Sequence, residues 1–448
     1  MQRKVGKTMG IKVVKFGGSS VADAIQLQKV KNIVLADPDR KFVIVSAPGK
    51  RFSEDSKITD LLYLCKTHID HNVSPEHVFQ VICDRFRSME MNLGVNIGIE
   101  KDLEEIRSNL KSGITADYIA SRGEYLCGKL AAAVLGFDFV DPAGLIQFDE
   151  RGRHLPEETH KALCAELAKH ECAVIPGFYG SMPNGTIKTF SRGGSDITGS
   201  IVARAAQAEL YENWTDVSGF LIADPRVVKN SEPIKTITYA ELRELAYMGA
   251  SVLHEDAIFP VRSAGIPINI KNTNRPEDYG TMIVSDTAEK PEHIITGIAG
   301  KKGMSVINIE KDKMNSTVGF GRNILRALEK SDVSFEHMPS GIDTMSVIIQ
   351  TDALTGKETA ILDEIHSRVH PDQLYIESDL ALITIVGRGM KSTRGTAAIL
   401  FEALAKSRVN VKMIDQGSSE LNIIIGVAEE DFEVAMRAIY DAFVNIKK

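Results

Sequence analysis

Residues 11–20, IKVVKFGGSS, combine a β-branched apolar run with a stop rich in glycine and serine. The run predicts a buried strand over 11–16, and apolar residues at helical spacing follow from Val21 to Leu35. A second buried strand is predicted over 42–46, FVIVS, which also ends at a Ser, Pro and Gly cluster. This order of strand, turn, helix and strand predicts an α/β domain with a largely parallel sheet. In such domains ligands usually bind at the carboxyl ends of the strands.

The alternation of strands and helices continues through the first two-thirds of the chain. Helices are predicted over 59–69 and 117–135. The pattern Thr238-x-x-Glu241 is a capping box, which predicts the start of another helix. Further strands are predicted over 173–176, 209–214 and 266–270.

The last third contains an internal repeat. SVINIE at 305–310 corresponds to ALITIV at 381–386, and MSVII at 345–349 corresponds to LNIII at 421–425. Each copy has the order of a small β-α-β-β-α-β module. Two such modules can pair their sheets and form a site at the interface, or they can be independent structural repeats. A polar, proline-containing stretch at 286–293 predicts the boundary before them.

Composition excludes several classes of protein. The 448 residues include 53 basic and 60 acidic side chains, a net charge of −7, which argues against a nucleic-acid or membrane partner. No apolar run approaches the ~18 residues of a membrane span, and no signal peptide is recognisable. The five cysteines show no C-x-x-C pair, so neither a disulfide framework nor a zinc site is expected. We therefore expect a soluble, cytoplasmic protein.

The first candidate site is the turn that follows the first strand, Lys15-Phe16-Gly17-Gly18-Ser19-Ser20. Two adjacent glycines let the backbone approach an anion closely, and a helix N-terminus offers free N–H groups. Lys15 adds a compact positive charge for phosphate oxygens. The motif is not a P-loop, and a plain tight turn is the alternative.

A second candidate is Ser191-Arg192-Gly193-Gly194-Ser195-Asp196, which precedes a helical run from residue 197. Arg192 could hold a substrate carboxylate through two hydrogen bonds. Ser195 or Asp196 could instead serve only as the helix N-cap.

Three weaker candidates complete the set. The stretch 214–219, WTDVSG, and the following Asp224-Pro225-Arg226 suit nucleotide contacts or a loop with Asx-turns. Glu124 could bind an ammonium group or interact with the dipole of a helix first turn. Lys271, after the strand IPINI, could reach a phosphate or remain in solvent.

Taken together, these motifs resemble the aspartate kinases of the amino-acid-kinase superfamily. KFGGSSV (15–21), SRGEYLCGKLAAAVL (121–135), SRGGSD (191–196), WTDVSGFLIADPRVV (214–228) and INIKNT (268–273) occur in that family's order. The duplicated tail resembles its paired ACT modules. The resemblance implies a three-layer α/β/α catalytic domain over 1–290. Two ferredoxin-like (βαββαβ) ACT modules are then expected over 291–375 and 376–448.

The implied reaction is transfer of the γ-phosphoryl group of MgATP to the β-carboxylate of L-aspartate. It gives 4-phospho-L-aspartate, the first step of lysine, threonine and methionine biosynthesis. Lys15 and Asp196 would be catalytic. The implied substrate residues are Ser46, Thr59, Glu124, Arg192, Gly193, Gly194 and Ser195. The implied nucleotide residues are Lys15, Gly17, Gly18, Ser19, Thr215, Asp216, Leu221, Arg226, Lys271 and Asn272. Mg²⁺ would be carried by phosphate oxygens, with no protein ligand expected.

The ACT modules imply feedback inhibition by an end-product amino acid, with L-lysine as the first expectation, and self-association as a dimer or tetramer. The implied effector residues are Met314, Ser316, Thr317, Gly319, Glu336 and Ser340, for which ordinary loop and capping roles are the alternative. Two other readings stay open. One is a superfamily kinase for glutamate, acetylglutamate, carbamate or a nucleoside monophosphate, and the other is a non-catalytic amino-acid sensor.

Overall fold

The computed structural model describes residues 10–191, 193–249, 255–287 and 291–444. It divides into two compact units. The first comprises the chain up to Phe220 together with Pro233–Tyr239 and Val252–Thr287, and the second comprises Leu221–Glu232, Ala240–Ser251 and the chain from Ala288.

The first unit is built on an eight-stranded sheet in the order β3-β4-β2-β1-β7-β9-β10-β8. The central strand β1 pairs in parallel with β2 on one side and β7 on the other. The predicted parallel sheet is therefore confirmed, and β10 is antiparallel to its neighbour β9. The strands are β1 Lys12–Phe16, β2 Arg40–Val45, β3 Asp138–Phe139, β4 Ala173–Pro176, β7 Leu210–Thr215, β8 Thr236–Thr238, β9 Ile268–Asn272 and β10 Thr281–Val284; a separate hairpin joins β5 Tyr179–Ser181 and β6 Ile187–Thr189.

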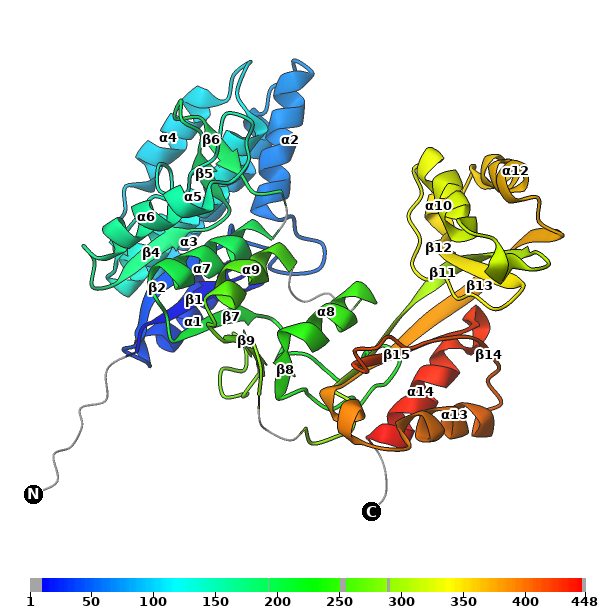
Figure 1. Cartoon of the computed structure of the whole chain (residues 1–448). Coiled ribbons are helices and arrows are strands. Elements are labelled where there is room, and N and C mark those ends of the chain that lie inside the picture. Colours follow the sequence, from blue (N-terminus) through cyan, green and yellow to red (C-terminus); the bar gives the residue numbers. More distant parts are fainter. Residues whose placement is uncertain (1–9, 192, 250–254, 288–290, 445–448) are drawn as a thin grey trace, which may run out of the picture. The chain divides into compact units, whose positions relative to one another are not determined.

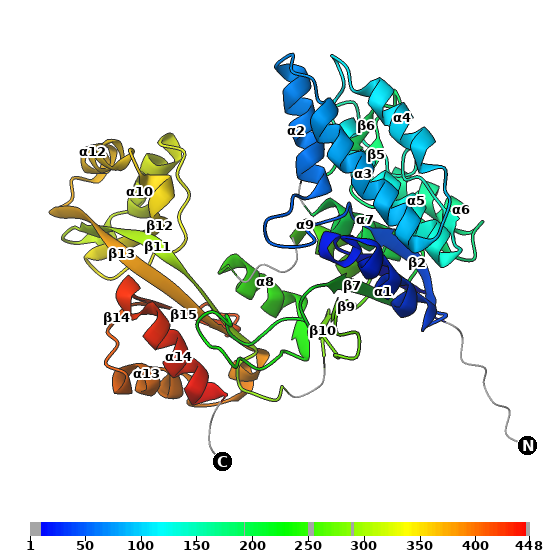
Figure 2. The ribbon, with the colours of Figure 1, turned by 180° about the vertical axis from the view of Figure 1, so that it is seen from behind.

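Helices cover both faces of this sheet (Figures 1 and 2). Val14 and Phe16 of β1 belong to the core beneath α1, α2, α3 and α5. Successive strand residues point to opposite faces. Lys15 accordingly points to the other face, where it meets α7. The helices are α1 Ala24–Leu35, α2 Ile58–Asp70, α3 Glu76–Leu93, α4 Ile99–Asn109, α5 Ala116–Leu135, α6 Pro156–Leu167, α7 Gly194–Ala205 and α9 Glu255–Ser263.

The helix predicted from Val21 begins later than expected. A short 3-10 turn, η1 Gly18–Val21, comes first, and α1 starts at Ala24. Asp23 sets that start because its side chain accepts a hydrogen bond from the backbone N–H of Gln26 at 2.9 Å. Four helices of the first unit, α3, α4, α6 and α9, are not predicted from the sequence.

The second unit contains a five-stranded antiparallel sheet in the order β12-β11-β13-β15-β14. Its strands are β11 Gly297–Glu310, β12 Thr344–Gln350, β13 Gln373–Val386, β14 Val411–Asp415 and β15 Asn422–Ala428. Its helices are α8 Tyr239–Tyr247, α10 Phe320–Lys330, α11 Thr351–Leu354, α12 Glu358–Val369, α13 Thr396–Lys406 and α14 Phe432–Phe443, with short turns η2 Met314–Ser316, η3 Arg388–Ser392 and η4 Glu429–Asp431.

The two repeats share this one sheet and are not independent domains. The repeated segments 305–310 and 381–386 lie in β11 and β13, which pair along their whole length. Gly297–Lys301, which precedes the first repeat, pairs with Val386–Leu382 of the second. In the first copy, the strand expected before β12 is reduced to isolated bridges at His337–Ile348 and Ser340–Met345.

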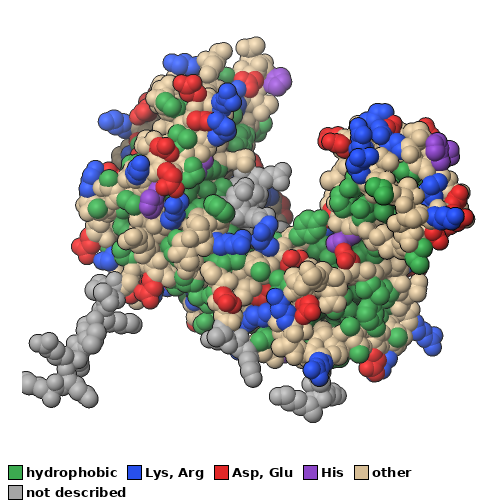
Figure 3. Space-filling model, in the orientation of Figure 1, with side chains coloured by type: hydrophobic (Ala, Val, Ile, Leu, Met, Phe, Trp, Pro, Cys, Tyr) green, Lys and Arg blue, Asp and Glu red, His purple; other side chains and the backbone are tan. Residues whose placement is uncertain are grey.

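In the face that Figure 3 displays, basic and acidic side chains are mixed over most of the surface. No described helix has both the length and the apolar character needed to cross a membrane. The five cysteines are free thiols.

Candidate functional site

The site is centred on the turn that follows β1. The N–H of Gly17 donates to the carbonyl of Trp214 at 3.0 Å, and the N–H of Gly49 donates to the carbonyl of Gly18 at 2.8 Å. A Cβ added at Gly49 would lie 2.7 Å from the carbonyl carbon of Gly18. Glycine is therefore required here by backbone contact between the 17–18 turn and the chain that leaves β2.

Lys15 lies at the carboxyl end of β1 and is only 7% exposed. Its Nζ is 2.5 Å from Oδ1 of Asp196 on α7 and 3.5 Å from Oδ1 of Asn213 on β7. Asn213 Nδ2 also donates to Asp196 Oδ1 at 2.8 Å. The structure thus brings together the two residues expected to be catalytic.

Asn213 is a site residue that sequence reasoning missed. It is 4% exposed and pairs in register with Lys15 across β1 and β7. A polar amide inside an otherwise buried strand was the available signal, because buried polar groups are normally hydrogen-bonded.

The start of α7 carries the second predicted motif. Gly193 is the N-cap, with a φ of 58°, and no side chain caps the helix. The alternative in which Ser195 or Asp196 acts as the N-cap is therefore wrong. Ser195 is buried, and a Cβ added at Gly177 would come within 2.6 Å of its side chain. Gly194 is the first residue of the helix. Arg192 lies outside the described residues.

Glu124 lies in the middle of α5, so the alternative role in a helix first turn is wrong. The side chain is 5% exposed, and its Oε2 has no hydrogen-bond partner among the residues that the structure describes. Burial raises the pKa of this carboxyl to about 8, against hydrogen bonding from the backbone N–H of Ala47. A buried carboxyl with an unpaired oxygen is a site for an incoming hydrogen-bond donor.

Residues 46–57, here called the connecting loop, run between β2 and α2 and link the two sides of the site. Ser46 N–H donates to the carbonyl of Phe16 at 3.1 Å. Ala47 hydrogen-bonds Glu124 through its N–H, and its carbonyl would lie 3.0 Å from a Cβ at Gly18. Ile58 N–H donates to Pro48 at 3.1 Å and thereby fixes the position of Thr59 in the first turn of α2.

The predicted nucleotide residues of the first unit lie around the ends of β7 and β9. The Thr215 hydroxyl is 3.1 Å from Asp216 Oδ1, and Asn272 Nδ2 donates to Ser218 Oγ at 3.0 Å. Lys271 donates to the Asp278 carbonyl at 2.7 Å and lies 5.3 Å from the ring centre of Trp214. It is half-buried and not a fully solvated lysine, and this desolvation lowers its pKa.

Three further predicted residues have different surroundings. Ser19 is half-buried in η1. Leu221 and Arg226 belong to the second unit, where both are exposed and Arg226 forms an ion pair with Asp224 at 2.6 Å.

The predicted effector residues lie in the first repeat. The turn around Met314 to Thr317 contacts the 340–345 turn, because Asn315 N–H donates to the Ile342 carbonyl at 3.0 Å. Met314 itself is buried in the module core, whereas Ser316, Thr317 and Ser340 are exposed. The helix expected near Thr317 begins at Phe320, with Gly319 as its N-cap.

Glu336, also predicted to bind the effector, already has partners within the second unit. Its carboxylate lies 3.1 Å from Lys301 Nζ and accepts from Gln350 Nε2 at 3.0 Å. These contacts and a hydrogen bond from Tyr247 keep the pKa of Glu336 below its usual value despite partial burial. The Glu336 N–H donates to the Ile348 carbonyl and Ser340 bridges Met345, so their partners on β12 are three residues, or about 10 Å, apart.

Among the described residues, no group of three or more His, Cys, Asp or Glu side chains is arranged to hold a metal ion.

Comparison with known proteins connects this geometry to one family. The amino acid kinase family model matches residues 10–272, and an ACT domain model matches 383–443. The chain is 40% identical to Aspartokinase 3 of Bacillus subtilis, over 97% of this chain and 98% of that protein. The crystal structure of the Clostridium acetobutylicum aspartate kinase superimposes with a TM-score of 0.90 at 51% identity, covering 97% of this chain and 100% of that one.

Two structures of E. coli aspartokinase III share the fold at 24% identity. One holds aspartate and ADP, with a TM-score of 0.72, and covers 96% of this chain and 99% of that one. The other holds lysine and aspartate, with a TM-score of 0.74, and covers 98% of this chain and 100% of that one.

Proposed function

This chain belongs to the aspartate kinases of the amino acid kinase family, and on that premise we propose that it transfers the γ-phosphoryl group of MgATP to the β-carboxylate of L-aspartate. The product is 4-phospho-L-aspartate. The observation that carries the proposal is the buried contact of Lys15 with Asp196 and Asn213 beside the 17–18 turn. We also propose that residues 1–290 form the catalytic domain and that residues 291–375 and 376–448 form the two ACT modules.

Phosphoryl transfer needs positioning and charge neutralisation more than covalent catalysis. The closely packed backbone at Gly17 and Gly18 accommodates the nucleotide phosphates without a side chain in the way. Lys15 then shares its ammonium group between Asp196 and the transferring phosphoryl oxygens. Asn213 holds both side chains in that geometry. Thr215, Asp216, Lys271 and Asn272 form the remainder of the nucleotide site in the first unit, with Ser19 as a proposed contributor. Mg²⁺ belongs with the nucleotide, because in kinase sites it binds substrate phosphates and keeps several waters.

The acceptor, L-aspartate, binds on the other side of the connecting loop. The unpaired Oε2 of Glu124 receives the ammonium group of aspartate, and Arg192 holds its α-carboxylate. Ser46, Thr59 and the 193–195 backbone flank the reacting β-carboxylate. That carboxylate is ionised at neutral pH, so no general base is required.

The identity of the acceptor is tested by trapping the acyl phosphate with hydroxylamine and quantifying the hydroxamate. Parallel reactions contain L-aspartate, L-glutamate, acetylglutamate or carbamate. We expect hydroxamate with L-aspartate far above the others. A preference for another acceptor would keep the kinase and overturn the assigned substrate, and no ATP-dependent product at all would indicate a non-catalytic sensor.

The ACT modules extend the proposal to regulation by L-lysine. The turn at Met314–Gly319 with Ser340 provides exposed polar groups for the ligand's carboxylate end, and Glu336 provides a carboxylate for an ammonium group. Glu336 is paired with Lys301, so the ammonium group of the effector would share or displace that contact. The separation of Glu336 from Ser340 fits an effector shared by two copies of the chain, so the proposal includes a dimer or tetramer, measurable by analytical ultracentrifugation.

A further inference from the structure

Arg85 is a buried cation that none of the roles above uses. It lies on α3 and is only 5% exposed, although arginine is rarely buried without partners. Its guanidinium does not face a substrate residue. It faces the connecting loop.

The guanidinium of Arg85 binds three backbone carbonyls from three places in the chain. Nη1 donates to Ser56 at 2.9 Å, and Nη2 donates to Ala22 at 2.9 Å and also to Gly49. A planar guanidinium offers five N–H donors in a fixed arrangement, so one side chain can fix several acceptors at once. A lysine ammonium has three donors on a flexible stem and cannot reproduce that planar set.

The carboxylate of Asp55, within the connecting loop, also contacts the Arg85 guanidinium. Asp55 Oδ2 lies 3.3 Å from Arg85 Nη1 and accepts from Arg51 Nε at 2.8 Å. The hydrogen bond from Arg51 holds the pKa of Asp55 well below its usual value, so the carboxylate stays ionised beside Arg85.

The three carbonyls belong to the segments that form the active site. Ala22 directly follows the 3-10 turn that contains Gly18. Gly49 touches the backbone of Gly18 and is two residues from Ala47, which hydrogen-bonds Glu124. Ser56 lies at the far end of the same loop, just before α2.

We infer that Arg85 is a positioning residue for phosphoryl transfer, because it fastens both ends of the connecting loop to the chain that leaves the 17–18 turn. This inference rests on the proposed kinase site. The described partners of Arg85 are Ser56, Ala22, Gly49 and Asp55, none of which is a proposed nucleotide or aspartate residue. It fixes the distance between the turn that holds the phosphates and the loop that supports the aspartate site, and errors of about 1 Å in such geometry can cost roughly 100-fold in rate.

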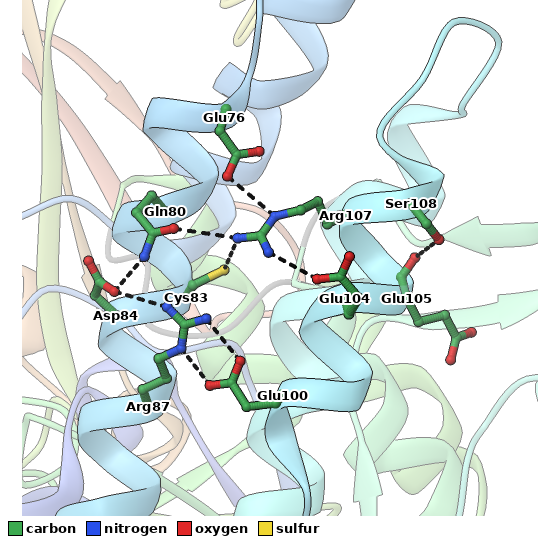
Figure 4. Close-up of polar contacts among 10 residues, drawn as sticks. All are labelled: Glu76, Gln80, Cys83, Asp84, Arg87, Glu100, Glu104, Glu105, Arg107 and Ser108. Carbon is green, nitrogen blue, oxygen red and sulfur yellow. Dashed lines mark hydrogen bonds and ion pairs between the residues drawn. The ribbon is translucent and has the colours of Figure 1, made fainter.

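The test compares Arg85→Lys with Arg87→Lys in the full-length protein. Arg87 is a matched control because it lies on the same helix and forms ion pairs with Glu100 at 2.5 Å and Asp84 at 3.2 Å (Figure 4). Its side chain is 35% exposed and contacts α4, not the connecting loop. For each variant we would measure kcat, the KM for ATP and for L-aspartate, and amide exchange of residues 46–57.

We expect Arg85→Lys to lower kcat/KM for ATP by roughly 10- to 100-fold, with a raised KM for both substrates and faster exchange confined to the connecting loop. Arg87→Lys should leave all of these unchanged. If kcat fell only by as much as the fraction of folded protein, with both KM values unchanged, Arg85 would be only structural. That result would overturn the inference. So would equal kinetics in the two variants.

A milder variant covers the case in which Arg85→Lys does not fold. Asp55→Asn removes the carboxylate charge that faces both Arg85 and Arg51 and leaves Arg85 in place, and we expect a smaller rise in the KM for ATP with the same local increase in exchange. Unchanged kinetics and exchange in that variant would overturn the inference. Aspartate-dependent turnover of the wild type tests the proposed function separately, so failure of one is distinguishable from failure of the other.

Discussion

At the scale of one residue, the sheet positions the ammonium group of Lys15 for phosphoryl transfer. Strand alternation turns it away from the core of Val14 and Phe16, and Asp196 meets it at 2.5 Å. We expect Lys15→Ala to lower kcat by ~100- to 1,000-fold, because the ammonium stabilises charge that develops in the transition state. Steady-state kinetics of the folded variant measure this.

The control for that change is Lys12→Ala. Lys12 lies on the same strand and pairs with Asp37 at 2.6 Å on a half-buried surface. Its loss should leave kcat unchanged. An unchanged kcat in Lys15→Ala would contradict the catalytic role.

Glu124 gives a prediction that depends on pH. Its carboxyl, with a pKa of about 8, is largely protonated in the free protein at neutral pH. An arriving ammonium group favours the ionised form, so binding releases a proton. The KM for L-aspartate is therefore expected to fall as the pH rises from about 6.5 to about 8.5. A KM independent of pH over that range would argue against Glu124 as the ammonium site.

Glu124→Gln separates binding from stability. The folded-state pKa lies above the unfolded value of about 4.3, so the folded protein loses stability as the pH rises from there toward 8. Glutamine removes that ionisation. We expect a melting temperature at pH 8 equal to or above that of the wild type, together with a KM for L-aspartate raised at least about tenfold. A variant that loses stability and keeps its KM would show that Glu124 is structural.

At the scale of elements, the sequence predicts best where a pattern is local. The strands at 11–16, 42–46 and 173–176 are confirmed, because β-branched runs that end at glycine or proline clusters identify buried parallel strands. Helices α3 and α4 are missed because polar and charged residues dominate their exposed faces, including the Arg87 and Arg107 networks of Figure 4.

In the site, too, residues in local sequence patterns are predictable and residues that act through long-range contacts are not. The Lys15 turn and the start of α7 are recognisable from glycines that precede helices, and the structure brings Lys15 and Asp196 together. Asn213 and Arg85 are not predictable in this way, because their roles depend on contacts between residues 198 and 63 positions apart in the chain, respectively.

The second unit contains a buried ion pair whose removal tests its packing. Glu241, on α8, is fully buried, and Arg388 in η3 binds it through Nη1 at 3.0 Å and through its backbone N–H at 2.8 Å. Thr296 donates to the same carboxylate at 2.6 Å. We expect Arg388→Ala to destabilise this unit by about 3–5 kcal/mol, because it removes a cation in contact with a fully buried carboxylate.

Urea unfolding followed by far-ultraviolet circular dichroism measures that loss. Arg437→Ala is the control, since Arg437 is half exposed, and its described partners are Glu433 at 3.3 Å and the Val227 carbonyl at 3.4 Å. Its midpoint should remain that of the wild type. Equal midpoints for the two variants would contradict the buried-pair account.

At the scale of the whole molecule, the duplicated modules carry the regulatory claim. An effector controls activity only if it binds one global state better than another. We expect Ser340→Leu to relieve inhibition by L-lysine while preserving kcat, because the larger side chain fills the exposed polar turn beside Ile342. Dose–response curves for L-lysine measure the shift.

Ser367→Leu provides the comparison for that experiment. Ser367 is exposed on α12 of the same repeat, and its hydroxyl donates to the Glu364 carbonyl, away from the 340–345 turn. Its inhibition curve should match that of the wild type. Full sensitivity in Ser340→Leu would place the effector elsewhere in the protein.

The measurement that tests the central claim most directly is ADP release with MgATP and L-aspartate, with and without L-lysine. The account predicts turnover that requires L-aspartate and that L-lysine suppresses. Aspartate-dependent turnover that is indifferent to L-lysine would keep the kinase and contradict the proposed effector. Absence of aspartate-dependent turnover would contradict the assignment of Lys15, Asp196 and Glu124 to an aspartate kinase site.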